Sequence, residues 1–421
     1  MAQPPEPDWI EKRLVGARPQ AVAALLRYFR DLDLAEEAFQ EACLRALKSW
    51  PRNGPPRDAA SWLVMVGRNA AIDHKRRQAR LTALPDEALI SDREDTEPEM
   101  AERLDAADYR DDILRLLFVC CHPVLPATQQ IALALRIVSG LSVPRIASAF
   151  LVAERAMEQR ITRAKARIAT ADIPFETPGP KERAERFAVV SAMLYLVFNE
   201  GYIDANPVSE RARLCDEAIR LARLMLRLFP CEPEILGLMA LMLLQHSRQK
   251  ARFDEAGAPI LLEDQDRSLW NRRRIAEALA MIDEAMLYRQ PGPYQIQAAI
   301  AAQHARAERP EDTDWAGIDR LYEALERHTP SPVVTLNRSV AVWKLFGAEA
   351  ALEMIAPLAE PLDGYFYFHG VRGNLLERLG RNSEARDAFG RAIALANTAA
   401  EAAHIRQHLD QLNAEQANGA S

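Results

Sequence analysis

The sequence lacks any long run of apolar residues. Hydrophobic residues make up 49% of its 421 residues, but no stretch approaches the roughly 18 consecutive apolar residues of a membrane helix. The first nine residues are rich in proline and acid, and they have neither the basic start nor the apolar run of a secretion signal. We therefore expect a water-soluble protein of the cytoplasm.

Cysteine and histidine are also scarce. The five cysteines form no CxxC pair, and an odd number cannot close completely into internal disulfides. Cys120, Cys121 and His122 are consecutive in the sequence, but a zinc site needs about four ligands and no nearby residue supplies the missing ones. We predict that they pack at a helix end and that the chain binds no metal or cofactor. No paired acid–base or nucleophile constellation appears, so we expect no enzyme activity.

No convincing strand pattern appears, whereas apolar residues recur at helical spacing through most of the chain. We therefore expect an all-α fold, and the length fits two to four domains. Segments rich in proline, glycine or acid divide the chain. The expected parts are a helical block at 1–80 with helices from about Pro19 and a loop at 50–56, an acidic linker at 81–103, a second block at 104–173, a hinge at 174–182, a helical array at 183–413 and a tail at 414–421.

Charge is distributed unevenly along the chain. The net charge is -7, but the charges of residues 1–175 sum to about zero. The excess negative charge therefore lies in residues 176–421. Residues 68–80 carry five Lys/Arg against one acid, residues 86–112 twelve acids against three Arg, and residues 142–170 six Lys/Arg against two Glu. This order of basic, acidic and basic segments suggests two nucleic-acid-binding segments joined by an acidic linker.

The first basic segment is predicted to lie on a helix that starts near Ser61. Trp62, Val66 and Asn69 share one stripe of this helix with three charged residues that follow. An aromatic side chain beside cations suits a single-stranded base, which offers a face to stack and a phosphate to neutralise. The alternative is a solvated helix end whose cations favour the C-terminal dipole. The residues predicted to hold a melted strand are Trp62, Arg68, Asn69, Asp73, Lys75, Arg76, Arg77 and Arg80.

The second basic segment has the succession of a helix-turn-helix motif. Residues 129–138 read as a helix, 140–142 as a turn that ends in an N-cap at Ser142, 143–150 as a short helix and 154–169 as a longer basic helix. This motif places its last helix in the major groove of DNA. A plain helical hairpin with a solvated basic face is the alternative.

The last helix of this motif has two different faces. One face is an apolar seam that we expect to be buried, formed by Met157, Ile161, Ala164 and Ile168. The other carries side chains that we expect to contact DNA: Arg155, Glu158, Gln159, Thr162 and Arg163 on base edges, and Arg160, Lys165 and Arg167 on phosphates. Ser142, at the start of the preceding short helix, is expected to contact DNA as well.

Small residues form a pattern near the end of the chain. Gly347 precedes Gly380 by 33 residues, close to the length of a tetratricopeptide repeat. Small residues at such offsets let two antiparallel helices approach closely, and a stacked array of such pairs leaves a concave face that usually binds protein. The residues at the offsets of one unit are Gly373, Gly380, Ala385, Phe389 and Ala392.

These segments together resemble the extracytoplasmic-function sigma factors of bacterial RNA polymerase. Asp33 to Trp50 is similar to the polymerase-binding part of sigma region 2, Ala60 to Arg77 to its promoter-melting part, and Leu133 to Lys165 to sigma region 4. Three further stretches resemble the subgroup with a tetratricopeptide-containing C-terminal extension. They are Cys120 to Pro123, Leu196 to Tyr202 and Leu261 to Trp270.

The resemblance implies a sigma factor whose partners are promoter DNA and core RNA polymerase. Region 2 would dock on the clamp helices and open the minus-ten element, with an extruded base held by the loop around Asn53. Region 4 would read the minus-thirty-five element beside the flap, and the extension, with a protein or a small molecule bound, would modulate activity. The residues expected to contact polymerase are Asp33, Glu36, Glu37, Gln40, Glu41 and Arg45, with Trp50 as the anchor at the helix end.

Two alternatives remain open at this point. The chain is either a sigma factor or a helix-turn-helix regulator with a tetratricopeptide sensor, and the regulator gives residues 33–80 no role. The stretch Leu261 to Trp270 is either a docking patch for the sigma domains or a lead-in to a helix. In the second interpretation Trp270 packs in the core while Asp264, Asp266 and Arg267 pair locally.

Overall fold

The computed structural model describes residues 8–54, 56–82, 106–171, 180–204, 206, 209–255, 257–396, 402, 405–406, 408–410 and 412, with the backbone alone for 8, 73–82, 106–111, 114 and 180–183. In this part of the chain all regular secondary structure is helical, apart from one isolated β-bridge between Phe253 and Pro259. The all-α prediction is therefore confirmed. The chain divides into two compact units, residues 1–200 and 201–421. The linker at 83–105 and the hinge at 172–179 lie outside the described residues.

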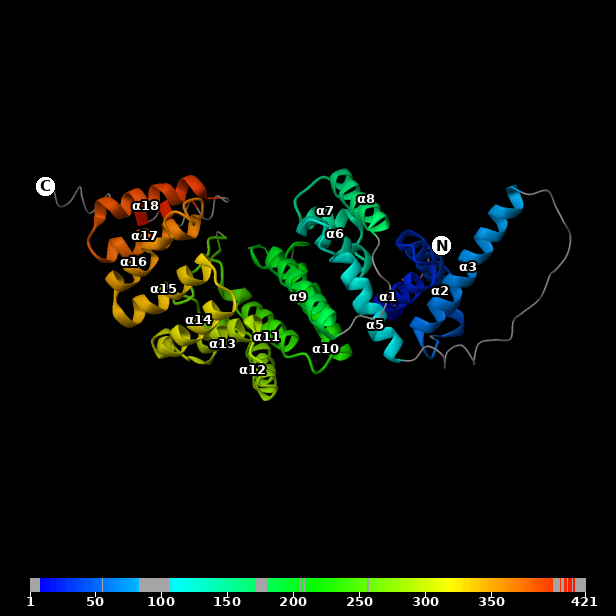
Figure 1. The fold of residues 1–421 in the computed structure, drawn as a ribbon, viewed down its shortest axis with the longest axis horizontal. Helices are drawn as coiled ribbons and strands as arrows, with labels where there is room; N and C mark the ends of the chain where they lie inside the picture. Colours follow the sequence, from blue (N-terminus) through cyan, green and yellow to red (C-terminus); the bar gives the residue numbers. More distant parts are fainter. Residues whose placement is uncertain are drawn as a thin grey trace. The chain divides into compact units, whose positions relative to one another are not determined.

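The first unit begins with three helices that pack against one another, α1 (Asp8–Phe29), α2 (Leu32–Asn53) and α3 (Ala59–Thr82) (Figure 1). The sequence-based boundaries need correction here. Helix α1 starts before the predicted Pro19 and continues through it, and α2 continues through Pro51. The end of α2 is set by Gly54, which has a left-handed φ of 78° and donates its N–H to the Trp50 carbonyl.

The break between α1 and α2 was missed by the sequence analysis. Arg30 has a φ of 52°, which ends α1. The Asp31 carboxylate then accepts hydrogen bonds from the N–H groups of Asp33 and Leu34, at 2.9 and 3.0 Å, and so caps α2.

The helix-turn-helix prediction is confirmed within about two residues. The first unit continues with α5 (Ala106–Cys120), α6 (Ala127–Ile137), α7 (Val143–Ala149) and α8 (Glu154–Thr170). Gly140 has a left-handed φ of 73° in the turn. Ser142 occupies the N-cap position as predicted, but its side chain makes no capping hydrogen bond, and Pro144 in the first turn starts α7 instead. The predicted seam of α8 is buried along its whole length.

Cys120 and Cys121 are buried at the C-terminal end of α5, where the sequence analysis placed them. Burial raises the pKa of both thiols well above the ordinary value. They therefore pack as small apolar groups.

The second unit is a succession of helices in which chain neighbours pack on one another (Figure 1). Helix α9 (Pro180–Tyr202) leads into it, and α11 lies between α10, α12 and α13, so it is buried on nearly all sides. No helix among the described residues is long and apolar enough to cross a membrane. The helices are α10 (Arg213–Leu228), α11 (Pro233–Ser247), α12 (Arg272–Leu287), α13 (Pro293–Arg306), α14 (Trp315–His328), α15 (Pro332–Phe346), α16 (Ala348–Ile355), α17 (Phe366–Arg378) and α18 (Asn382–Leu395), with short 3-10 turns η1 (Gln249–Ala251), η2 (Arg267–Leu269), η3 (Pro310–Asp312) and η4 (Ala356–Leu358).

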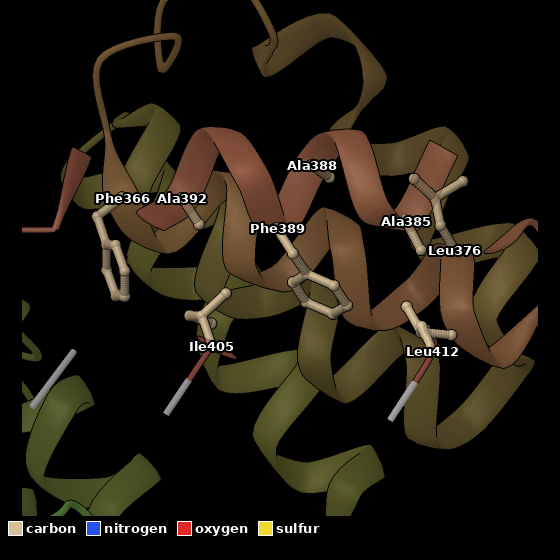
Figure 2. Close-up of a cluster of buried hydrophobic side chains, with 8 residues drawn as sticks. All are labelled: Phe366, Leu376, Ala385, Ala388, Phe389, Ala392, Ile405 and Leu412. Carbon is tan, nitrogen blue, oxygen red and sulfur yellow. The ribbon is translucent and has the colours of Figure 1, made fainter. Parts of the chain in front are cut away.

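Helices α17 and α18 approach as closely as the small-residue pattern predicts. Gly347 ends α15 and Gly380 follows α17, both with a left-handed φ, of 93° and 70°. A Cβ atom on Gly373 would lie 2.5 Å from the ring of Phe389, which is completely buried. Figure 2 shows this ring pointing from α18 toward Ile405 and Leu412.

We predict opposite effects of two glycine substitutions in this hairpin. Gly373→Ala should lower the free energy of unfolding by about 1–3 kcal/mol, because the Phe389 ring must move in a packed core. Gly390→Ala on α18 should raise it by about 0.5–1 kcal/mol, because nothing lies within 4 Å of the new Cβ atom and alanine favours the helix. Denaturant unfolding of both variants measures this difference, and equal effects would contradict the close approach.

Candidate nucleic-acid interface

The base-reading face predicted on α8 is exposed to solvent. Arg155, Glu158, Gln159, Thr162 and Arg163 are all exposed, opposite the buried seam. The Thr162 hydroxyl donates to the Glu158 carbonyl at 2.9 Å, which fixes its rotamer. A row of exposed polar side chains on a helix whose other face is held in a core has the geometry of a recognition helix.

The three cations predicted to contact phosphates behave differently from one another. Arg160 is half-buried, and Arg167 is exposed with its guanidinium donating to the Gln129 side chain at 3.3 Å. Lys165 departs from the prediction, because its ammonium donates to Asp33 Oδ1 at 2.6 Å and to Glu36 Oε2 at 2.9 Å. In this form Lys165 therefore binds α2.

Glu36 is the centre of a buried ion cluster that joins α1, α2, α6 and α8. Its side chain was predicted to contact polymerase, but the residue is only 5% exposed. Its carboxylate oxygens lie 2.9 Å from Arg136, 2.9 Å from Lys165 and 3.4 Å from Arg18. Burial alone would lower the pKa of Lys165, but its hydrogen bonds to Asp33 and Glu36 outweigh that effect and raise the pKa. Removing one partner from such a cluster lowers the stability of the folded form by about 3–5 kcal/mol, because the remaining buried charges are then unpaired.

Arg18 is the part of this cluster that the sequence analysis did not find. Its guanidinium donates to the carbonyls of Ile137 and Arg136, at 2.9 and 3.1 Å, and lies over the Phe39 ring at 4.9 Å. A Cβ atom on Gly140 would lie 2.7 Å from the Arg18 side chain. Arg18 therefore occupies the turn of the helix-turn-helix motif. The one local signal was a cation three positions before the apolar run that begins at Ala21 in α1.

A second buried acid joins α1 to α5. Asp112 on α5 is 3% exposed, and it pairs with Arg27 on α1 at 3.3 Å and with Arg115 at 3.0 Å. Together the Glu36 cluster and Asp112 hold the three-helix part of the first unit against the helix-turn-helix part.

The outer face of α2 carries most of the residues predicted to contact polymerase. Glu37, Gln40 and Arg45 are exposed, and Glu41 is half-buried with its carboxylate 3.2 Å from Arg45. Asp33 is exposed as well, although it binds Lys165. Leu44 lies on the same face and is 54% exposed. Leu44 was not predicted from the sequence, because Trp50 was taken as the apolar anchor of this helix.

Trp50 was predicted to anchor polymerase, and its position corrects that prediction. The residue is 2% exposed, because its ring stacks on Trp9 at 6.3 Å and meets the half-buried Trp62 edge-on at 5.4 Å. Trp50 thus fills the core where the start of α1, the end of α2 and the start of α3 meet. In this form Trp62 offers only part of its ring to a base.

The surface of α3 is open for part of the predicted single-strand site. Asn53 and Asn69 are exposed, and the Arg68 guanidinium lies over the exposed ring of Tyr28 at 4.9 Å. Tyr28 is a further aromatic residue on this surface, and the sequence analysis did not select it. The side chains of Asp73, Lys75, Arg76, Arg77 and Arg80 lie outside the described residues.

The stretch Leu261 to Trp270 follows the helix lead-in interpretation, with one correction. Trp270 is 3% exposed, as that interpretation predicts, and the Asp266 carboxylate accepts the Ser268 N–H at 2.8 Å. Arg267 does not pair with the nearby acids; its guanidinium donates to the carbonyls of His304 and Ala307 at the end of α13.

Comparison with known proteins assigns both DNA-directed parts of the first unit. Residues 14–81 match Sigma-70 region 2, residues 115–168 match Sigma-70, region 4, and residues 186–286 match a family of unknown function. An uncharacterized protein, R00370 of Rhizobium meliloti (strain 1021), is 71% identical over 410 residues, which cover 97% of each chain. The chain belongs to the same family as this protein. It carries sigma-70 regions 2 and 4, which support a role in promoter recognition and transcription initiation.

We predict that reversing the charge of Lys165 separates region 4 from region 2. Lys165→Glu places a third acid against Asp33 and Glu36, and a loss of about 3 kcal/mol in the free energy of the contact between the regions corresponds to roughly a hundredfold more open form. Amide hydrogen exchange in α2 and α8 should therefore become about a hundredfold faster. Arg163→Glu is the matched control, because it makes the same change at an exposed position of the same helix. Equal exchange in the two variants would show that the cluster does not hold the regions together.

Proposed function

We propose that this chain is a sigma factor of the extracytoplasmic-function type, which brings core RNA polymerase to specific promoters. One observation carries the proposal: the first unit has two exposed surfaces. They are the polar face of the recognition helix α8 and the outer face of α2. A regulator that acts only on duplex DNA would need the first surface and would leave the second without a role.

The outer face of α2 has the composition of a protein interface. An exposed apolar side chain, Leu44, lies among Glu37, Gln40, Glu41 and Arg45. Interfaces commonly combine an apolar centre with a polar rim, and a few central residues carry most of the affinity. We propose that polymerase binds here, with Leu44 in the role that the sequence analysis gave to Trp50.

We propose that the contact between region 2 and region 4 is a resting form. Lys165 and Asp33, which are expected to contact phosphate and polymerase respectively, neutralise one another in it. Promoter binding would then require the two regions to separate, and polymerase or DNA phosphates would replace the lost charge partners. A ligand shifts such an equilibrium only through its greater affinity for one form.

We propose that the second unit is a tetratricopeptide-like domain that modulates this activity. The support is the 33-residue spacing of Gly347 and Gly380, two glycines with left-handed φ next to helix ends, and the tight hairpin of α17 and α18. Arrays of helical hairpins present extended surfaces for partners.

Transcription from a purified system tests the proposed function. Full-length protein added to sigma-free core polymerase should start transcription on a cognate promoter. Leu44→Asp should weaken binding to core polymerase about 30-fold, which corresponds to about 2 kcal/mol for a charge at the centre of an interface. Leu287→Asp is the control, because Leu287 is 79% exposed in the second unit. Duplex binding without core binding or transcription would instead identify a helix-turn-helix regulator.

A further inference from the structure

Three arginines of the second unit converge on two aromatic rings. The Arg267 and Arg248 guanidiniums lie 4.9 and 6.0 Å from the centre of the Trp270 ring. Arg248 also donates to the Tyr202 hydroxyl at 3.1 Å. Arg252 lies over the Tyr202 ring at 3.4 Å and donates to the Tyr202 carbonyl. We call these three arginines the arginine cluster.

None of the three guanidiniums has a carboxylate within 4 Å among the residues that the structure describes. Burial lowers the pKa of Arg252 and of Arg267, and Arg248 lowers both further through repulsion. The acids that act on Arg267 from a distance are Glu311 and Asp312, and Asp312 is already bound by Arg309 at 2.9 Å. Cations in partly buried positions are normally paired, so this cluster lacks a compensating negative charge.

Neither the neighbouring histidine nor the neighbouring cysteine carries a negative charge at pH 7 that could balance the three arginines. Burial lowers the pKa of His304 to about 4, with further lowering by Arg248 and Arg267, so this imidazole is neutral at pH 7. Burial raises the pKa of the Cys215 thiol near Arg252 to about 12, so it is neutral as well. Among the described side chains, acids act on this cluster only from a distance, so none of them pairs directly with it.

The cluster retains unused hydrogen-bond donors. Backbone carbonyls fix Arg252 and Arg267, whereas Arg248 uses one of its five N–H donors, on Tyr202. The Trp270 indole N–H and the Arg267 Nε–H are buried without a hydrogen-bond partner in the described structure. Both residues are more than nine-tenths buried. Such a set of donors without acceptors is complementary to an oxyanion.

We propose that the arginine cluster binds the phosphate group of a small molecule. Arg252 and Arg267 form a frame that the backbone holds rigidly, and Arg248 closes on the phosphate oxygens through its forked donors, which suit phosphate geometry. Free phosphate and a phosphorylated metabolite would offer the same chemistry to this site. The proposal is independent of the sigma-factor proposal, because binding requires neither polymerase nor DNA.

Thermal unfolding and calorimetry of the full-length protein test this proposal, with inorganic phosphate and pyrophosphate as probes and sodium chloride at equal ionic strength as the reference. We expect both anions to raise Tm beyond chloride, since a ligand that binds only the folded form stabilises it. Saturation with one ion per chain is expected. Tighter binding of pyrophosphate would indicate a phosphorylated metabolite as the source, and equal binding would indicate free phosphate.

Substitution of Arg248 distinguishes a binding site from a structural brace. Arg248→Met should raise Tm without phosphate, because it removes an uncompensated cation, and should weaken anion binding about tenfold or more. Arg273→Met is the matched control at an exposed position nearby and should change neither quantity. If Arg248→Met does not fold, Arg248→Lys, which keeps the charge but loses the forked donors, should still weaken binding. No anion effect beyond chloride, or a lower Tm of Arg248→Met without phosphate, would overturn the proposal.

Discussion

The burial of the Glu36 carboxylate among three cations is the interaction on which the first unit depends. Arg18, Arg136 and Lys165 reach it from α1, α6 and α8, so one acid joins region 2 to region 4. A contact built on ion pairs differs from one built on apolar area, because a competing charged partner can replace each pair. Nucleic-acid phosphates and a polymerase surface are both charged partners of this kind. In the proposed resting form these charges hold the regions together, and in the proposed active form they would bind the partners instead.

The sequence predicted those elements whose determinants are local. The helix-turn-helix motif was found from Gly140, the turn and the apolar period of α8, which are all close together in the chain. The hairpin of α17 and α18 was found from Gly373 and Phe389 in the same way. The boundaries of α1 and α2 were missed, since Pro19 was taken as a helix start and Pro51 as part of a loop, although the helices continue through them.

The sequence did not predict what depends on distant segments. Arg18 binds carbonyls 118 and 119 residues away, and no local pattern carries that information. Glu36 resembles Gln40 and Glu41 in its spacing, and the positions of α1, α6 and α8 distinguish this buried acid from its neighbours on α2. Trp50 was chosen as an anchor because of its chemistry, whereas packing against Trp9 and Trp62 buries it. On α8 the side chains selected for base contacts are exposed, whereas the selected Lys165 binds α2.

The central claim is that polymerase binds α2 while region 4 leaves it. Amide hydrogen exchange of the full-length protein, measured with and without core polymerase, tests this claim most directly. The account predicts slower exchange on α2 and faster exchange on α8 in the same sample, because one helix gains a partner as the other loses its ion pairs. Unchanged exchange on both helices, or protection of α8 together with α2 in the absence of DNA, would contradict it.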